Sequence, residues 1–134
     1  AGEYYQKALE VRQRLSKAAP ENADYARNLS VSYERLGDLS RALGEASKAG
    51  EYYQKALEVS QRLSKAAPEN ADYARDLWVS YWRLASHCES TGNPTAASRW
   101  WQLAHNTLQG MLDKGLFVSR EDLQYLEQIR GKLN

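Results

Sequence analysis

The chain has 134 residues, of which 43% are hydrophobic and 26% charged, a composition typical of one globular domain rather than of a disordered or fibrous protein. Eighteen basic and 17 acidic residues are interspersed and leave a net charge of +1, which disfavours binding to nucleic acid or to an anionic membrane surface. A single cysteine excludes an internal disulfide, and no apolar run approaches the roughly 20 residues of a membrane span, so we expect a cytoplasmic protein.

A long internal repeat dominates the sequence. Residues 1–36 recur as residues 49–84, at an offset of 48 residues. The copies differ at four positions: Arg12 and Ser60, Asn28 and Asp76, Ser30 and Trp78, and Glu34 and Trp82. A fixed period of this length indicates helical units that bury their apolar faces against one another. We therefore predict one all-α domain, 1–134, built as a right-handed solenoid of antiparallel helix pairs with about six helices.

Residues 1–19 are predicted to form the second helix of a truncated repeat. Apolar residues recur there at helical spacing: Ala1, Tyr5, Ala8, Val11 and Leu15. No first helix precedes this segment in the sequence, so part of the stripe should face water. We expect two copies of the chain to pair through this open end as a homodimer.

Residues 21–67 are predicted to form a full repeat and residues 69–114 a terminal repeat, each a hairpin of two helices. Pro20 and Pro68 end the helices that precede them. The second helix of the full repeat carries the stripe Ala49, Tyr53, Ala56, Leu63 and Ala67. The first helices carry Tyr25, Leu29, Ser32, Leu36 and Leu43 in one copy, and Tyr73, Leu77, Ser80 and Leu84 in the next.

Local signals mark the ends of these helices. Gly44 and Gly92 can take the positive φ that a helix end often requires. Asn93 is a natural N-cap, and Pro94 suits the first position of the helix that follows.

Residues 119–133 are predicted to form a C-terminal capping helix. Ser119 with Asp122 approximates a capping box. The narrow apolar face comprises Leu123, Leu126, Ile129 or Arg130, and Leu133. An array needs a polar outer wall at its end, which the other, charged face supplies.

Two tryptophans distinguish the terminal repeat, since Trp78 and Trp82 replace the Ser30 and Glu34 of the inner copy. Their spacing of four residues places them on one helix face. We expect them to pack against the capping helix through Leu123, Tyr125 or Leu126. The alternative is an exposed aromatic hot spot for a partner.

The repeat resembles the tetratricopeptide family. The residues that carry the resemblance are Tyr33, Leu36, Gly37, Ala49, Tyr53 and Ala56, and in the next copy Tyr81, Leu84, Ala85, Ala97, Trp101 and Ala104. The period exceeds the family's, which is about 34 residues, so each helix is longer by about two turns. Ser40 and Cys88 stand where the family has a tyrosine. Long, near-identical repeats of this kind are similar to those of bacterial tetratricopeptide arrays.

No sequence motif for catalysis, for a cofactor or for a metal is present. His87, Cys88 and His105 offer three metal ligands at best, and adjacent helical residues point about 100° apart. We interpret the cysteine as a small buried residue and the histidines as packing or surface groups. The chain is therefore predicted not to be an enzyme.

The resemblance implies that a concave face, lined by the first helix of each pair, binds a protein or peptide. That face would carry Glu34, Asp38, Arg41, Trp78, Trp82, Arg83, Ser86 and Glu89. These residues do not suit the family's lysine-and-asparagine clamp on a terminal carboxylate. A surface that is merely solvated is the alternative.

We predict a non-enzymatic protein-interaction module, a scaffold or adaptor. The alternative is a self-associating repeat spacer, as an engineered or excised fragment with no ligand of its own. Helical-repeat RNA binding is disfavoured by the charge of +1 and the missing basic stripe.

Overall fold

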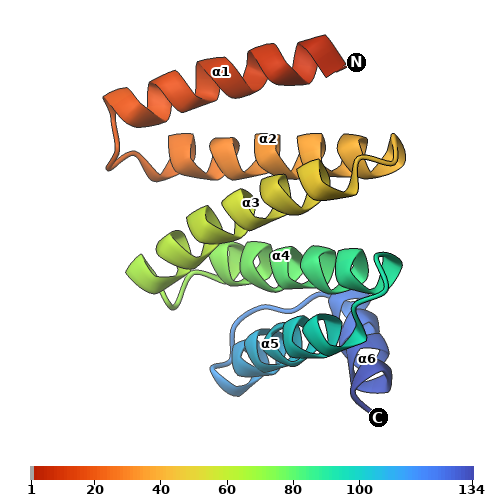
Figure 1. Ribbon diagram of the computed structural model, residues 1–134. Coiled ribbons are helices and arrows are strands. Elements are labelled where there is room, and N and C mark those ends of the chain that lie inside the picture. Colours follow the sequence, from red (N-terminus) through yellow and green to blue (C-terminus); the bar gives the residue numbers. More distant parts are fainter. Residues whose placement is uncertain (1) are drawn as a thin grey trace. The chain divides into compact units, whose positions relative to one another are not determined.

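The computed structural model describes residues 2–134, and in this range the chain forms six α-helices and no strand. The helices are α1 (Gly2–Ala18), α2 (Ala23–Ala42), α3 (Ala46–Ala66), α4 (Ala71–Ser90), α5 (Pro94–Asp113) and α6 (Arg120–Leu133) (Figure 1). The predicted all-α class, with helix pairs built on a repeat, is confirmed. Ala1, the first residue of the predicted stripe, lies outside the described residues.

The chain divides into two compact units, residues 1–63 and residues 64–134. The boundary falls inside α3 and not in the loop between the two predicted repeats. The first unit holds α1, α2 and most of α3, and the second holds α4, α5 and α6.

Two of the helix starts follow the predicted capping. Asn93 caps α5, with Pro94 as its first residue, and Ser119 caps α6. Asn22 and Asn70, which were not predicted as caps, each accept a hydrogen bond of 3.0 Å from the backbone N–H three residues further on, and so cap α2 and α4. In each case the cap and the N–H that donates to it are neighbours in the chain.

Glycines end α2 and α4 as predicted, since Gly44 and Gly92 both have a φ of 77°. After α2 the Gly44 N–H donates to the carbonyl of Arg41, and the Glu45 N–H donates to that of Ser40. This pair of hydrogen bonds satisfies carbonyls that the helix leaves open, and it requires the left-handed conformation that favours glycine.

The core of the first unit lies between α1, α2 and α3. It consists of Leu9, Leu29, Tyr33, Leu36 and Ala56, with Tyr5 and Tyr52 packed against it. Tyr5, Leu29, Leu36 and Ala56 lie on the predicted stripes, which point inward at these positions. Leu9, Tyr33 and Tyr52 were not on the predicted stripes, and Leu9, rather than Val11 or Leu15, is the buried apolar residue of α1. Leu43 is an exception: it was predicted on the stripe of α2, but it is the residue that ends the helix and is 66% exposed.

The helices α2 and α3 approach each other closely at Gly37. A Cβ at this position would lie 2.6 Å from Cε1 of Tyr53, well inside van der Waals contact. The Tyr53 hydroxyl donates to Asp38 at 2.6 Å, which fixes the ring over the glycine. Gly37 must therefore be small, because the Tyr53 ring packs directly on it.

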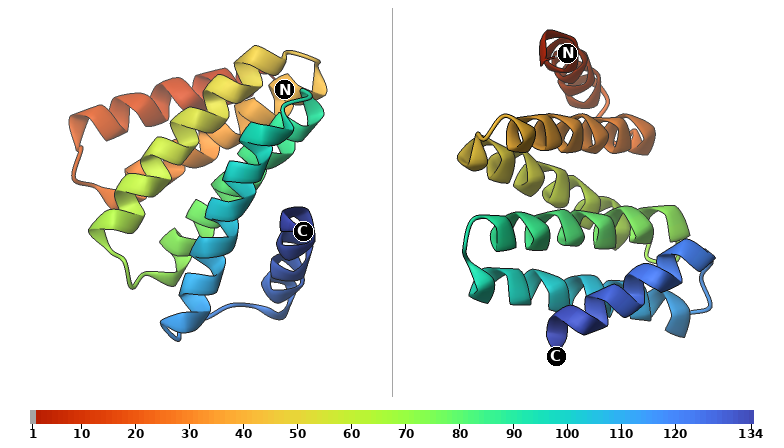
Figure 2. Two further views of the ribbon diagram at one scale, coloured as in Figure 1. Left: turned by 60° about the horizontal axis from the view of Figure 1, so that its bottom comes forward. Right: turned by 90° about the vertical axis from the view of Figure 1, so that its right-hand side faces the viewer.

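In the second unit α4 and α5 form the main helix pair, and α6 returns along it after the segment 114–119 (Figure 2). Trp101, Leu108 and Ile129 are among the largest fully buried side chains of the chain. The last of these comes from α6, so this helix contributes to the core of the unit.

Candidate functional site

An aromatic cluster links α4, α5 and α6 in the second unit. We call it the α6 cluster, and its members are Trp78, Trp82, Trp101 and Tyr125. The Trp82 ring lies at its centre, with centroids 5.0 Å from Trp101 and 5.1 Å from Tyr125, both edge-on. Trp78 lies 5.8 Å from Tyr125. Edge-on pairs are worth about 0.5–1.5 kcal/mol each beyond the area that they bury. The predicted packing of both tryptophans on the capping helix is confirmed, through Tyr125.

Polar contacts at both ends of α6 hold it in register on this cluster. Near its start, Nε and Nη2 of Arg75 donate to the two carboxylate oxygens of Asp122 at 2.8 and 3.3 Å. This ion pair raises the pKa of Arg75, chiefly through the hydrogen bond to Asp122. At the other end Lys132 donates to Glu89 at 3.1 Å, and the Trp101 indole N–H donates to the same carboxylate at 2.9 Å.

These contacts recur on α6 at the spacing of one helix face, from Asp122 through Tyr125 and Ile129 to Lys132. That is the pattern by which an amphipathic helix lies in a groove. The face of α4 and α5 is therefore a surface that binds a helix, and α6 occupies it.

Two expectations about this face are corrected. Trp78 was predicted to line an exposed partner-binding face, but it is 2% exposed because α6 covers it. Leu123 was predicted on the inward face of α6, but it is exposed, and Asp122 is buried in its place. The carboxylate of Asp122 pairs with Arg75, because a bidentate ion pair outweighs the single hydrogen bond of a capping box.

The other predicted residues are divided between the two units. On α4, Trp82, Arg83 and Ser86 are half-buried, and Glu89 is exposed but holds Lys132 of α6. On α2, Glu34 is half-buried, whereas Asp38 and Arg41 are exposed. Asp38 is held by the Tyr53 hydroxyl.

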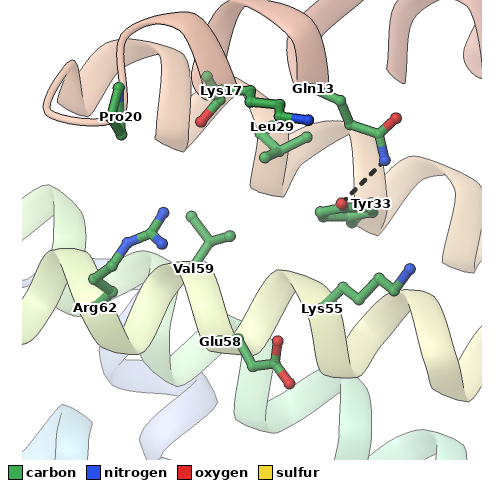
Figure 3. Close-up of a pocket in the computed structure, with 10 residues that line it drawn as sticks. Gln13, Lys17, Pro20, Leu29, Tyr33, Lys55, Glu58, Val59 and Arg62 are labelled. Atoms are coloured by element: carbon green, nitrogen blue, oxygen red, sulfur yellow. Dashed lines mark hydrogen bonds between the residues drawn. The ribbon is translucent and has the colours of Figure 1, made fainter. Parts of the chain in front are cut away.

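A groove between α1 and α3 in the first unit was not found by the sequence analysis (Figure 3). This α1–α3 groove has a volume of about 380 Å³ and is lined by Gln13, Ser16, Lys17, Pro20, Leu29, Tyr33, Lys55, Glu58, Val59 and Arg62. Leu29 and Val59 form its apolar floor and are buried. Gln13 donates to the Tyr33 hydroxyl at 3.3 Å across it. The remaining lining residues place polar and charged groups on an apolar floor, as ligand sites do.

The second unit has a counterpart of this groove at the equivalent positions. Ser64 and Pro68 repeat Ser16 and Pro20, but the volume is only about 180 Å³. Lys114 donates to the Pro68 carbonyl at 3.3 Å on this surface. The repeat thus forms the same hollow twice, with different linings.

Cys88 was predicted to be buried, but it is half-buried. The partial burial raises the pKa of the Cys88 thiol, against a smaller opposing effect of a hydrogen bond with Trp100. His87 is buried and His105 is half-buried. Among residues 2–134, no three His, Cys, Asp or Glu side chains come together as a metal site.

In the described part of the chain, every helix is too short or too polar to cross a bilayer.

The duplicated sequence and the helix pairs define an all-α helical-repeat protein. The chain belongs to the family described as "Protein of unknown function (DUF2753)", whose model matches residues 44–130, from before α3 to near the end of α6. Comparison with curated proteins gave no match.

Proposed function

We propose that the chain is a tetratricopeptide-like, non-enzymatic module of the cytoplasm that binds a segment of a partner protein on the first helices of its repeats. The observation that carries the proposal is the seating of α6. The second unit already holds a helix through an aromatic cluster and an ion pair at each end. A face that binds its own helix in this way has the chemistry to bind another.

Each unit offers its own accessible part of the predicted face as the proposed contact surface. These residues are Asp38 and Arg41 on α2 in the first unit, and Arg83 and Ser86 on α4 in the second. Trp78 and Trp82 act indirectly in this proposal, because they hold α6.

Affinity purification with matched variants tests the proposal. We expect a defined protein to co-purify with the wild-type chain and with Gln54→Glu, an exposed change on α3. Arg41→Glu should release a protein held by the first unit, and Ser86→Glu a protein held by the second. Proteins retained equally by all four chains, or by none, would contradict the proposed face.

A second candidate, self-association, is favoured by one comparison. Val11 and Leu15 of α1 are 47% and 41% exposed, whereas the identical residues Val59 and Leu63 of α3 are 7% and 8% exposed. The same stripe is thus buried in one helix and open to water in the other, and an open apolar stripe favours association.

The exposed residues of the stripe are not all those expected. Tyr5 packs on the core of the first unit, so Val11 and Leu15 are better places to disrupt a dimer. Light scattering over a concentration series should show a dimer that Val11→Glu with Leu15→Glu abolishes. A monomeric mass at every concentration would exclude this candidate.

A further inference from the structure

We infer that the α1–α3 groove is a binding site for an extended acidic peptide segment, separate from the face proposed above. The charged side chains that line the groove are mostly basic. Lys17, Lys55 and Arg62 reach the groove, against the one carboxylate of Glu58. Figure 3 shows Glu58 pointing to the side of α3 away from α1, while Lys17 and Arg62 extend into the space between the helices.

The cations at the groove have no carboxylate partner among the described residues. Among residues 2–134, neither Lys17 nor Arg62 forms an ion pair, and Lys55 lies 5.7 Å from the centre of the Tyr33 ring. A cation without a carboxylate partner beside an apolar floor is available to a ligand anion.

The counterpart groove of the second unit shows that the repeat folds without the charges of α3. There the positions of Lys55, Glu58 and Arg62 are taken by Leu103, Asn106 and Gly110, whereas the position of Lys17 keeps a lysine, Lys65. The charges that α3 adds to the groove are therefore a property of the first unit and not a requirement of the helix pair. At the other end of the same two helices, a hollow of about 430 Å³ mixes Glu3, Glu10 and Glu45 with Lys7 and Lys48, so the basic bias is confined to one end.

The spacing of the cations specifies the kind of ligand. Lys55 and Arg62 are seven residues apart on α3, which separates them by about 10.5 Å along the helix. In an extended polyproline-type peptide, residues i and i+3 lie on one side and are about 9.3 Å apart. Two carboxylates at that spacing match the two cations, and an aliphatic residue between them can contact Leu29 and Val59 on the floor. This apolar floor favours a peptide over a nucleic acid, because the phosphates of a nucleic acid gain nothing from contact with apolar side chains.

Fluorescence anisotropy with a labelled peptide, Glu-Leu-Pro-Glu-Leu-Pro-Glu, tests the inference on the full chain. We expect the wild-type chain to bind it, and binding to weaken severalfold when NaCl rises from about 0.05 M to 0.5 M. The variant Lys55→Glu with Arg62→Glu should lose about tenfold or more in affinity. Lys55→Gln with Arg62→Gln repeats the test without placing new carboxylates beside Glu58, and should also weaken binding.

The matched control reverses two exposed cations outside the groove, Lys65→Glu with Arg99→Glu, and should bind as the wild type does. Three results would overturn the inference: no binding of the acidic peptide at millimolar concentration, an equal loss in the control variant, or tighter binding of a single-stranded oligothymidine that the groove variants abolish. Because the variants of the proposed partner face lie on α2 and α4, a failure here is distinguishable from a failure of the proposed function.

Discussion

Replacing Gly37 with alanine tests the close contact between α2 and α3. In an open helix position, a glycine-to-alanine change stabilises a protein by roughly 0.5–1 kcal/mol, because glycine loses more backbone entropy on folding. At Gly37 the new Cβ would lie 2.6 Å from Cε1 and 2.7 Å from Cδ1 of Tyr53. Carbon atoms normally pack at about 3.5–4.0 Å, so the ring must move by about 1 Å.

The Tyr53 ring cannot move freely, since it is buried and its hydroxyl donates to Asp38 at 2.6 Å. Overpacking of this kind costs about 1–3 kcal/mol. After subtraction of the helix-propensity gain, Gly37→Ala should lower the free energy of unfolding by about 1–2 kcal/mol.

Guanidinium unfolding followed by far-UV circular dichroism measures this free energy. The matched control is Gly110→Ala, a helical glycine of α5 at which a Cβ meets no atom within 4 Å, and which should gain about 0.5 kcal/mol. Tyr53→Leu in the Gly37→Ala background should recover part of the loss, because the clash disappears with the ring. If Gly37→Ala stabilised the chain as much as Gly110→Ala does, the reasoning from the ring contact would be wrong.

Three further predictions follow from burial and charge. Tyr53→Ala should cost about 3–5 kcal/mol in a denaturant titration and Tyr5→Ala less, because Tyr53 is fully buried and Tyr5 only partly; equal losses would contradict this. Arg75→Ala should cost about 1–3 kcal/mol and shift tryptophan emission to the red, because it leaves the buried Asp122 carboxylate without its cation; an unchanged spectrum would argue against the anchoring of α6. Cys88 should be alkylated by iodoacetamide more slowly than free cysteine at pH 8, with a rate that keeps rising to higher pH, because its raised pKa reduces the thiolate fraction; a rate equal to that of free cysteine would contradict the raised pKa.

Helix positions were predictable from the sequence because their determinants are local. A cap lies three residues from its donor, as at Asn22, and a terminating glycine directly follows its helix, as at Gly44. The inward stripes were predictable for the same reason, since helical periodicity fixes which residues share a face. The prediction fails at Leu43, where the stripe continues in sequence but the helix has ended.

The sites depend on contacts that sequence periodicity does not specify. The sequence predicts Asp122 as a capping residue. In the folded unit its carboxylate is instead turned inward, because it pairs with Arg75. The groove was missed because Lys55 and Arg62 look like ordinary surface charges, and their copies in α1, Lys7 and Arg14, occupy other surroundings. The i, i+7 spacing of Lys55 and Arg62 was visible in the sequence, but Leu29, which α2 contributes to the apolar floor between them, was not.

The differences between the two copies lie where their surroundings differ. Arg12 extends from α1 to the hydroxyl of Ser32 at 2.6 Å, whereas its counterpart Ser60 in α3 is fully buried and leaves no room for a guanidinium.

Ser30 and Glu34 become Trp78 and Trp82, the two residues that receive Tyr125 of α6. The contacts within each unit do not explain the fourth difference, Asn28 and Asp76. Residues 1–36 and 49–84 otherwise match, so the three explained changes show which side chain the surroundings of each position require. Exchanging Trp78 and Trp82 for serine and glutamate should therefore release α6 while leaving the α4–α5 pair folded, because the inner copy carries those residues in an intact helix. Loss of the far-UV helical signal beyond that of α6 would show instead that the tryptophans are needed for the pair itself.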